Sequence, residues 1–164
     1  MRVGVRIGID VGKARIGVAR TDLHGMLATP VETVPRADDG SDLRRIRAIA
    51  EELDAFEYVV GLPLAMSGGE TASTQDAKGF AARLADDEAA SDGAGRPVRM
   101  IDERLSTVSA QAALHRSGRN TRTSRPVIDQ VAAVILVQHA LDSERASGKP
   151  PGILLHPSQG KGSD

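Results

Sequence analysis

Residues 1–20 read MRVGVRIGIDVGKARIGVAR, and this stretch decides the fold that the sequence predicts. Apolar residues occupy every second position from Val3 to Val11, which is the period of a β-strand with one apolar face. Residues 12–14 form a short turn, and residues 15–20 alternate again. The pattern therefore predicts a β-hairpin with the carboxylate of Asp10 late in its first strand, among glycines that let a ligand approach the backbone. A core hairpin with an incidental aspartate explains these residues equally well.

The rest of the chain alternates between strand and helix patterns. A third strand is expected over residues 27–34, at a sheet edge because Pro30 cannot donate a ladder hydrogen bond. Helices and strands then follow in turn, at residues 43–54, 58–62, 77–90, 97–101 and 110–115, and in a last helix that starts at Pro126. This order predicts an α/β fold with a mixed five-stranded sheet, three antiparallel strands followed by β-α-β units, and helices on both faces. We expect one domain over residues 1–146 and a disordered tail over residues 147–164.

The composition excludes several classes of function. With 164 residues, the chain is long enough for one domain with a real core. It has no cysteine, which excludes disulfides, thiol nucleophiles and zinc-thiolate sites. Aromatic residues make up only 2%, so no platform for stacking nucleic-acid bases can be assembled. We see neither a signal peptide nor a membrane-spanning run, and we therefore expect a cytoplasmic protein without a membrane partner.

The formal net charge of −1 hides an uneven distribution of charge. Residues 37–95 hold 13 acids and 5 bases, whereas residues 1–36 hold 6 bases and 3 acids. Residues 96–164 hold 10 bases and 6 acids. The two ends of the chain are therefore basic, and one face of the molecule can still meet a polyanion.

Acidic residues stand out by their position at three places in the chain. Asp10 lies late in the first strand, Asp102 and Glu103 follow a strand expected to be parallel to it, and Asp129 is expected in the first turn of the last helix. Each has an ordinary structural explanation on its own. If they converge, their mutual repulsion requires a cation. Oxygen ligands favour Mg²⁺ or Mn²⁺, and two such ions about 3.5–4 Å apart can drive phosphodiester hydrolysis.

Basic residues suit a phosphate-containing substrate. Four arginines recur at every third position in an expected loop that contains no acid, namely Arg116, Arg119, Arg122 and Arg125. Such a cluster can grip a nucleic-acid backbone, although a charged, solvated loop would look the same. Lys13 and Arg15 in the first turn, and Arg104 directly after the acids, are further candidates for phosphate contacts.

Four segments together resemble the YqgF/RuvX family of small bacterial proteins with an RNase H-like fold. They are GIDVGKARIGVA near Asp10, VVGLPL followed by SG, DERLST at Asp102, and the late DQVAAVILVQ that starts at Asp129. The resemblance runs from about Arg6 to Leu141. Many members have an acid in the loop after GLPL, where this chain has Ser67, so the loop contacts of those members do not carry over.

The resemblance implies a metal-dependent nuclease related to Holliday-junction resolvases and assigned to maturation of the 5′ end of pre-16S rRNA. It also implies that Asp10, Glu103 and Asp129 are the catalytic and metal-binding acids, with two Mg²⁺ or Mn²⁺ ions. Structured RNA and branched DNA both remain as substrates, and a homodimer is allowed. A non-catalytic RNA-binding module is a further alternative. An actin-like ATP-binding protein shares the GIDxG opening, but needs two domains and a longer chain.

Overall fold

A single mixed sheet forms the centre of the computed structural model, which describes residues 1–91, 95–104 and 121–157, with side chains from residue 128 in the last range. The strands are β1 (Val5–Val11), β2 (Arg15–Thr21), β3 (Ala28–Pro35), β4 (Ala55–Leu62), β5 (Val98–Asp102) and β6 (Ile153–Leu155). Their order in the sheet is β3-β2-β1-β4-β5-β6. The β1/β4 and β4/β5 pairs are parallel, and the other three are antiparallel. The predicted α/β fold is confirmed.

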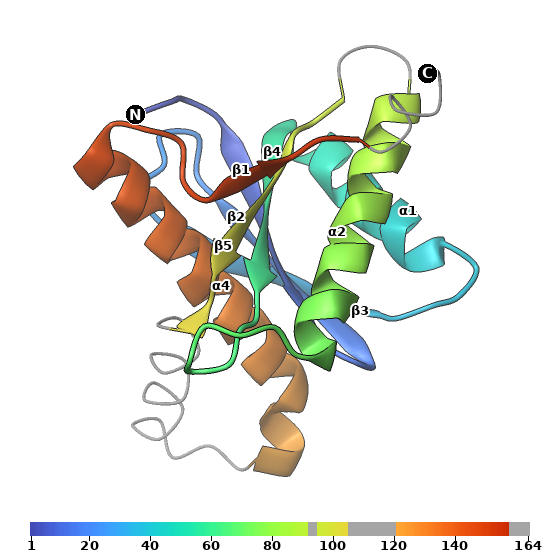
Figure 1. The fold of residues 1–164 in the computed structure, drawn as a ribbon. Coiled ribbons are helices and arrows are strands. Elements are labelled where there is room, and N and C mark those ends of the chain that lie inside the picture. Colours follow the sequence, from blue (N-terminus) through green and yellow to red (C-terminus); the bar gives the residue numbers. More distant parts are fainter. Residues whose placement is uncertain (92–94, 105–120, 158–164) are drawn as a thin grey trace, which may run out of the picture.

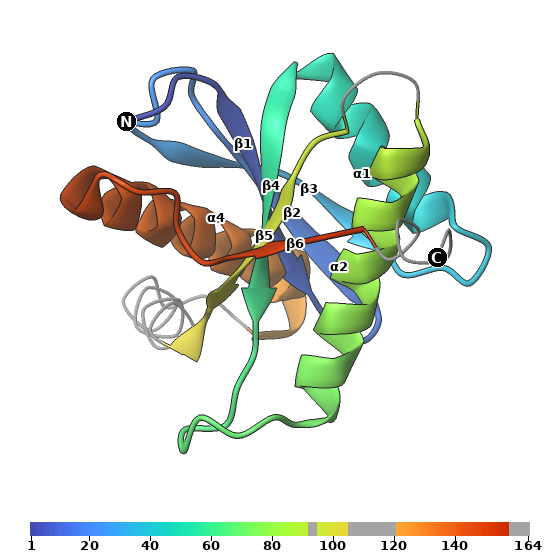
Figure 2. The same cartoon turned by 45° about the horizontal axis from the view of Figure 1, so that its top comes forward.

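Helices cover both faces of this sheet (Figure 1). Helices α1 (Ser41–Glu52) and α2 (Ala72–Ala90) lie on one face, and α4 (Thr121–Ser147) crosses the other. The view turned by 45° shows the same three layers, with the sheet between α4 and the α1/α2 pair (Figure 2). None of the described helices is both long and apolar enough to span a membrane.

The two faces are packed in different ways because the strands alternate. Toward α1 and α2 the sheet presents large aliphatic side chains such as Ile7, Ile9 and Val60, which pack with Ile46 and Phe80 in a large buried cluster. Toward α4 it presents several glycines and alanines beside Val59 and Ile101, and the cluster there is smaller. Its members are Ala19, Ala28, Val59, Ile101, Ala133, Leu136, Val137 and Ala140. The period-2 alternation in the first twenty residues therefore assigns each side chain to one of these two layers.

Strand β3 confirms the expected sheet edge and shows how its proline is accommodated. Pro30 pairs with Ala19, whereas the preceding pair in the register is Val18 with Glu32, so Val31 is an extra residue on the edge strand. This bulge lies where the ladder would otherwise need an N–H that proline lacks.

Two predictions about the C-terminal part are wrong. The sheet has six strands rather than five, because Ile153–Leu155 pairs with β5 although it lies in the expected disordered tail. A three-residue strand after Pro-Pro-Gly is too short to show a period. Helix α4 starts at Thr121 rather than at Pro126, so Asp129 lies beyond the first turn, and Arg122 and Arg125 are helical rather than in a loop. Packing along the sheet stabilises a helix of 27 residues regardless of weak local signals at its start.

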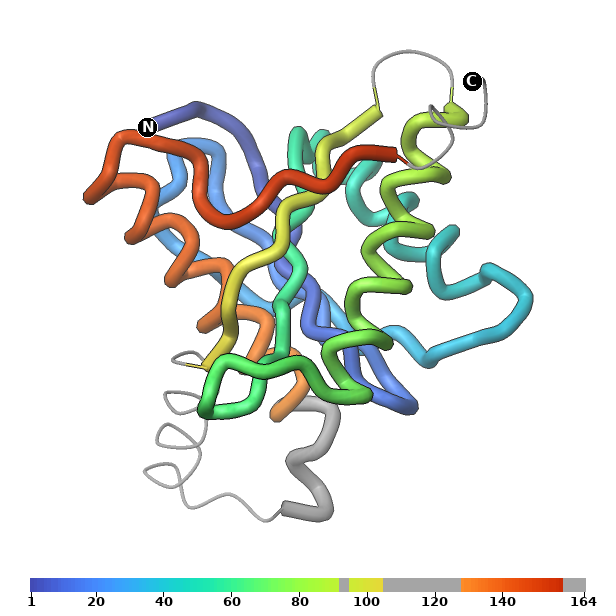
Figure 3. Tube along the Cα trace, viewed as in Figure 1, coloured from blue at the N-terminus to red at the C-terminus, as the bar shows by residue number. Residues whose placement is uncertain are grey.

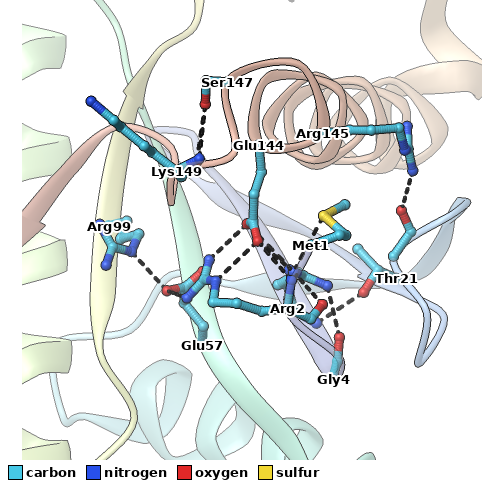
Figure 4. Close-up of polar contacts among 12 residues, drawn as sticks. Met1, Arg2, Gly4, Thr21, Glu57, Arg99, Glu144, Arg145, Ser147 and Lys149 are labelled. Carbon is cyan, nitrogen blue, oxygen red and sulfur yellow. Dashed lines mark hydrogen bonds and ion pairs between the residues drawn. The ribbon is translucent and has the colours of Figure 1, made fainter.

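The far end of α4 is joined to the N-terminus by a buried ionic cluster (Figure 4). The Arg2 guanidinium donates to Glu144 Oε1 at 2.8 Å and to Glu57 Oε2 at 2.9 Å. Arg6 is buried beside them and reaches Glu144 Oε2 at 3.3 Å. Arg99 donates to Glu57 Oε2 at 2.7 Å. The tube view shows the same proximity of the first residues to the end of α4 (Figure 3). The cluster therefore fixes one end of α4 to the sheet.

Candidate active site

The candidate active site lies on the α4 face of the sheet, where β1, β4 and β5 end. Ile9 pairs with Val60, so Asp10 lies beside Gly61 on the central strand β4. Glu103 follows β5, and its N–H donates to the carbonyl oxygen of Leu62 at 3.3 Å. A Cβ atom on Gly61 would lie 2.0 Å from Glu103 Oε2. The missing side chain on β4 therefore creates the space in which carboxylates from β1 and β5 meet.

Asp10 and Glu103 share a hydrogen bond between their carboxyl groups. Burial raises the pKa of Glu103 most, and the nearby charges of Asp10 and Asp102 raise it further. Burial also raises the pKa of Asp10, as does the charge of Asp129, while the hydrogen bond from Glu103 acts in the opposite direction. Glu103 is consequently the group that holds the shared proton and donates it to Asp10. A divalent cation that displaces this proton would gain two converging oxygen ligands.

Asp129 reaches the same corner from α4. A Cβ atom on Gly17 would lie 1.9 Å from the Asp129 carbonyl oxygen, so this glycine lets the helix backbone touch β2. Gly17 pairs with Asp10 across the hairpin, which brings Asp129 near enough for its charge to act on Asp10. The Asp129 side chain is held by Arg15, whose Nε donates to Oδ2 at 2.9 Å.

Three acids thus come close together without forming one ligand set. Asp10 and Glu103 are in direct contact, whereas the Asp129 carboxylate is paired with Arg15. Among the described residues, no group of three or more His, Cys, Asp or Glu side chains is arranged to hold a metal ion. The buried, proton-sharing pair of carboxylates fits a divalent cation by its donor chemistry, and Oδ2 of Asp129 can join it only after its hydrogen bond from Arg15 opens.

Asp102 has a separate partner despite its position next to Glu103. Its carboxylate accepts from Nε of Arg104 at 2.9 Å and from the Arg104 backbone N–H at 3.0 Å. These hydrogen bonds hold the pKa of Asp102 below its ordinary value. Arg104 also donates from Nη1 to the carbonyl oxygen of Met66, at 3.2 Å, which ties the end of β5 to the loop after β4. Asp102 therefore holds Arg104, which in turn contacts the loop after β4, while the charge of Asp102 still acts on Glu103.

The structure does not bring the other predicted phosphate-binding residues together beside Arg15. Lys13 lines an open cavity of about 660 Å³ together with Arg36 and Arg83 and with three aspartates. Arg116 and Arg119 lie outside the described residues. Arg122 and Arg125 belong to α4, and their side chains are likewise outside the description.

Sequence reasoning missed Gly17 and Gly61, the two residues that allow the acids to approach each other. Both lie on the α4 face with Gly8, where a Cβ atom would be 2.7 Å from Val137 Cβ. The sequence did contain a signal for these glycines. They occupy alternate positions in strands whose other positions carry large aliphatic side chains. Such a pattern indicates close approach of another backbone.

The chain was compared with known proteins. Residues 4–143 match the family model described as "RuvX: Holliday junction resolvase". A "Putative pre-16S rRNA nuclease" of Clavibacter michiganensis subsp. michiganensis is 64% identical, with 94% of this chain and 93% of that protein covered. A protein of the same name from Leifsonia xyli subsp. xyli is 57% identical, with coverage of 98% and 99%.

Solved structures add evidence on the fold. The structure titled "T. thermophilus RuvC in complex with Holliday junction substrate" matches with a TM-score of 0.52 and 19% identity, over 90% of this chain and 99% of that chain. This match agrees with the RNase H-like architecture predicted from the motifs. The family model and the near-complete coverage of the relatives then establish that the chain belongs to the RuvX family.

Proposed function

We propose that the protein is a metal-dependent endonuclease that hydrolyses phosphodiester bonds of the pre-16S rRNA precursor, in the maturation of its 5′ end. The observation that carries this proposal is the buried pair of Asp10 and Glu103, which meet over Gly61 at the ends of parallel strands. The relatives of this chain that carry the name pre-16S rRNA nuclease support the choice of substrate. A nuclease that acts on a ribosomal RNA precursor is expected in the cytoplasm.

Asp10 and Glu103 are the residues that would hold Mg²⁺ or Mn²⁺, and Asp129 would complete a site for two ions. Bound ions of this kind supply Lewis acidity and neutralise the charge that develops on the phosphate. The protein contributes two carboxyl groups whose pKa values are raised by burial, so that they share a proton in the absence of a cation. A bound cation would replace this proton. The protein also supplies the strand ends of β1 and β5 at which Asp10 and Glu103 are fixed, and Arg15 and Lys13 to contact the backbone of the substrate.

The test is cleavage of a precursor RNA that carries the 5′ extension, with Mg²⁺ or Mn²⁺ added. We expect Asp10→Asn and Glu103→Gln to reduce the rate about a thousandfold or more while the protein stays folded. Asp142→Asn is the matched control, because this exposed acid at the far end of α4 contacts only Gln138 and Arg145 among the described residues. Cleavage by Asp10→Asn at the wild-type rate would contradict the proposal.

Resolution of branched DNA is a second candidate, favoured by the description of the family model as a Holliday junction resolvase. A four-way junction must be cut on two strands, so this activity calls for a homodimer with two sites. Parallel cleavage assays on a four-way junction and on the precursor RNA distinguish the two substrates. Light scattering measures the mass of the protein in solution and so tests for the homodimer. Binding of RNA with a steep salt dependence but without cleavage would instead favour the non-catalytic module.

A further inference from the structure

The ion pair between Arg15 and Asp129 joins a candidate phosphate-binding residue to a candidate metal ligand. Arg15 Nε donates to Asp129 Oδ2 at 2.9 Å. The side chains are 38% and 19% exposed, so water and solutes reach both of them. Partly exposed ion pairs of this kind are weak and open readily. Each partner is therefore available to a stronger ligand of opposite charge.

Both backbones are fixed, so only the two side chains can exchange partners. The Asp129 carbonyl rests against Gly17, where not even a methyl group would fit. The turn before Arg15 is closed by a hydrogen bond from the Gly12 N–H to the Arg15 carbonyl oxygen at 2.9 Å. The Asp129 backbone lies against Gly17, which is the cross-strand partner of Asp10, so an Asp129 side chain that leaves Arg15 remains beside Asp10.

We infer that Arg15 and a divalent cation compete for Asp129, so that release of Asp129 frees the Arg15 guanidinium for a backbone phosphate of the nucleic acid. This inference rests on the proposed function and adds its regulation. The cation and the nucleic acid both require the Arg15–Asp129 ion pair to open. The ligand that binds first supplies the free energy of opening, so the second ligand binds more tightly. Linkage requires this coupling to be equal in both directions. Arg15 thereby acts as a positioning residue that makes cation and substrate bind together.

A double-mutant cycle, measured without any divalent cation, tests whether release of Arg15 from Asp129 strengthens binding of the nucleic acid. Binding of a labelled RNA stem with a 5′ extension is measured in EDTA, so that cleavage does not interfere. Asp129→Asn hardly changes the shape of the side chain but removes the charge that holds the Arg15 guanidinium. This substitution should therefore tighten RNA binding about two- to fivefold. In an Arg15→Gln background the same substitution should have no such effect, since the released group is absent.

Lys13 provides the matched control, because it lies two residues from Arg15 and forms no ion pair among the residues that the structure describes. In a Lys13→Gln background, Asp129→Asn should tighten binding as it does in the wild type. Equal tightening in the Arg15→Gln background would overturn the inference, because removal of a negative charge would then explain the whole effect. Thermal melting confirms that each variant is folded.

A second measurement separates this inference from the proposed function. Isothermal titration with Mn²⁺, in the absence and presence of an uncleavable analogue of the RNA, should give a stronger coupling between cation and RNA in the wild-type protein than in Arg15→Gln. If both ligands bind and their coupling is the same in the two proteins, the inference fails and the proposed function stands. If the wild-type protein binds neither RNA nor Mn²⁺, the proposed function itself fails.

Discussion

Glycines fix the distances within the site, because they determine where backbones and carboxylates can touch. We predict that Gly17→Ala destabilises the protein by about 1–3 kcal/mol or more, since the new methyl group would lie 1.9 Å from the Asp129 carbonyl oxygen. The displaced helix would also carry Asp129 away from Asp10, so nuclease activity should fall further than stability alone explains. Urea unfolding and a cleavage assay measure the two effects.

Gly79 in α2 provides the control for that substitution. The atom nearest to a Cβ atom there is Nη1 of Arg83 at 3.7 Å, so a methyl group fits without a clash. Gly79→Ala should stabilise the protein by about 0.5–1 kcal/mol through helix propensity. Equal effects of the two alanines would show that the contact at Gly17 is unimportant.

The buried carboxylates should lower the stability of the cation-free protein at alkaline pH. Folding raises the pKa of Asp10 to about 6 and that of Glu103 to about 8, from ordinary values of 3.8 and 4.5. The folded state thus binds protons more tightly than the unfolded state, and its stability falls as the pH rises through this range. Asp10→Asn removes one charge and should raise the Tm in EDTA by about 2–4 °C or more at pH 8.

At pH 5 the same substitution should change the Tm much less, because the shared proton is then present. Melting curves of wild type and Asp10→Asn at both pH values test this expectation. A Tm difference that does not depend on pH would mean that the charge of Asp10 is not the cause.

At the residue level, sequence position was a good guide to the acids and a poor guide to their partners. Asp10 and the Asp102–Glu103 pair could be selected because they lie at the carboxyl ends of strands expected to be parallel, and the family resemblance then singled out Glu103. The pairing of Arg15 with Asp129 spans 114 positions, and only the packing of α4 on Gly17 creates it. The salt bridge between Asp102 and Arg104 is local, yet Glu103 lies even closer to Arg104 in the sequence.

Among the elements, α4 is held at both ends by ionic contacts to the same face of the sheet. Arg15 holds Asp129 near the start, and Arg2 and Arg6 hold Glu144 near the end. We predict that Glu144→Gln destabilises the protein by about 3–5 kcal/mol, because it leaves the buried Arg6 without its counter-charge. Asp142→Asn, at an exposed position two residues before Glu144, should cost less than about 0.5 kcal/mol.

The stability contributed by Glu144 should depend on pH in the direction opposite to that of Asp10. Hydrogen bonds from Arg2 lower the pKa of Glu144 to about 2, from an ordinary value of 4.5. This contribution is complete above pH 4.5 and is lost as the pH falls toward 2. Acid denaturation should therefore be less steep in Glu144→Gln than in the wild type, and an unchanged slope would contradict the assignment.

In the part of the chain that the structure describes, element types were predicted well and element ends less well, and the helix expected at residues 110–115 lies outside that part. The first hairpin, the edge strand with Pro30 and the buried strand β4 all follow from period and composition. Helix α2 starts at Ala72, five residues before the expected Ala77, because Thr71 and Thr74 form a reciprocal cap. Threonine at both positions of such a cap is a weaker sequence signal than the usual glutamate.

For the whole molecule, the position of β6 predicts that the domain needs residues beyond 146. Strand β6 covers the edge of β5, and the Gly152 backbone lies against the carbonyl oxygen of Met100. A chain that ends at Lys149 should be less stable by about 2–4 kcal/mol than one that ends at Pro157, because ladder hydrogen bonds and apolar contacts are lost. Equal melting temperatures would instead support the boundary at residue 146.

The different packing of the two sheet faces determines where the protein can be engineered. Between the sheet and helices α1 and α2, aliphatic side chains such as Ile46 and Leu84 can be exchanged for others of similar volume at little cost. The α4 face offers no such freedom, since its glycines already touch a neighbouring backbone or carboxylate. Heat-resistant versions of this enzyme can therefore be sought by redesigning one layer while the reaction centre in the other is left alone.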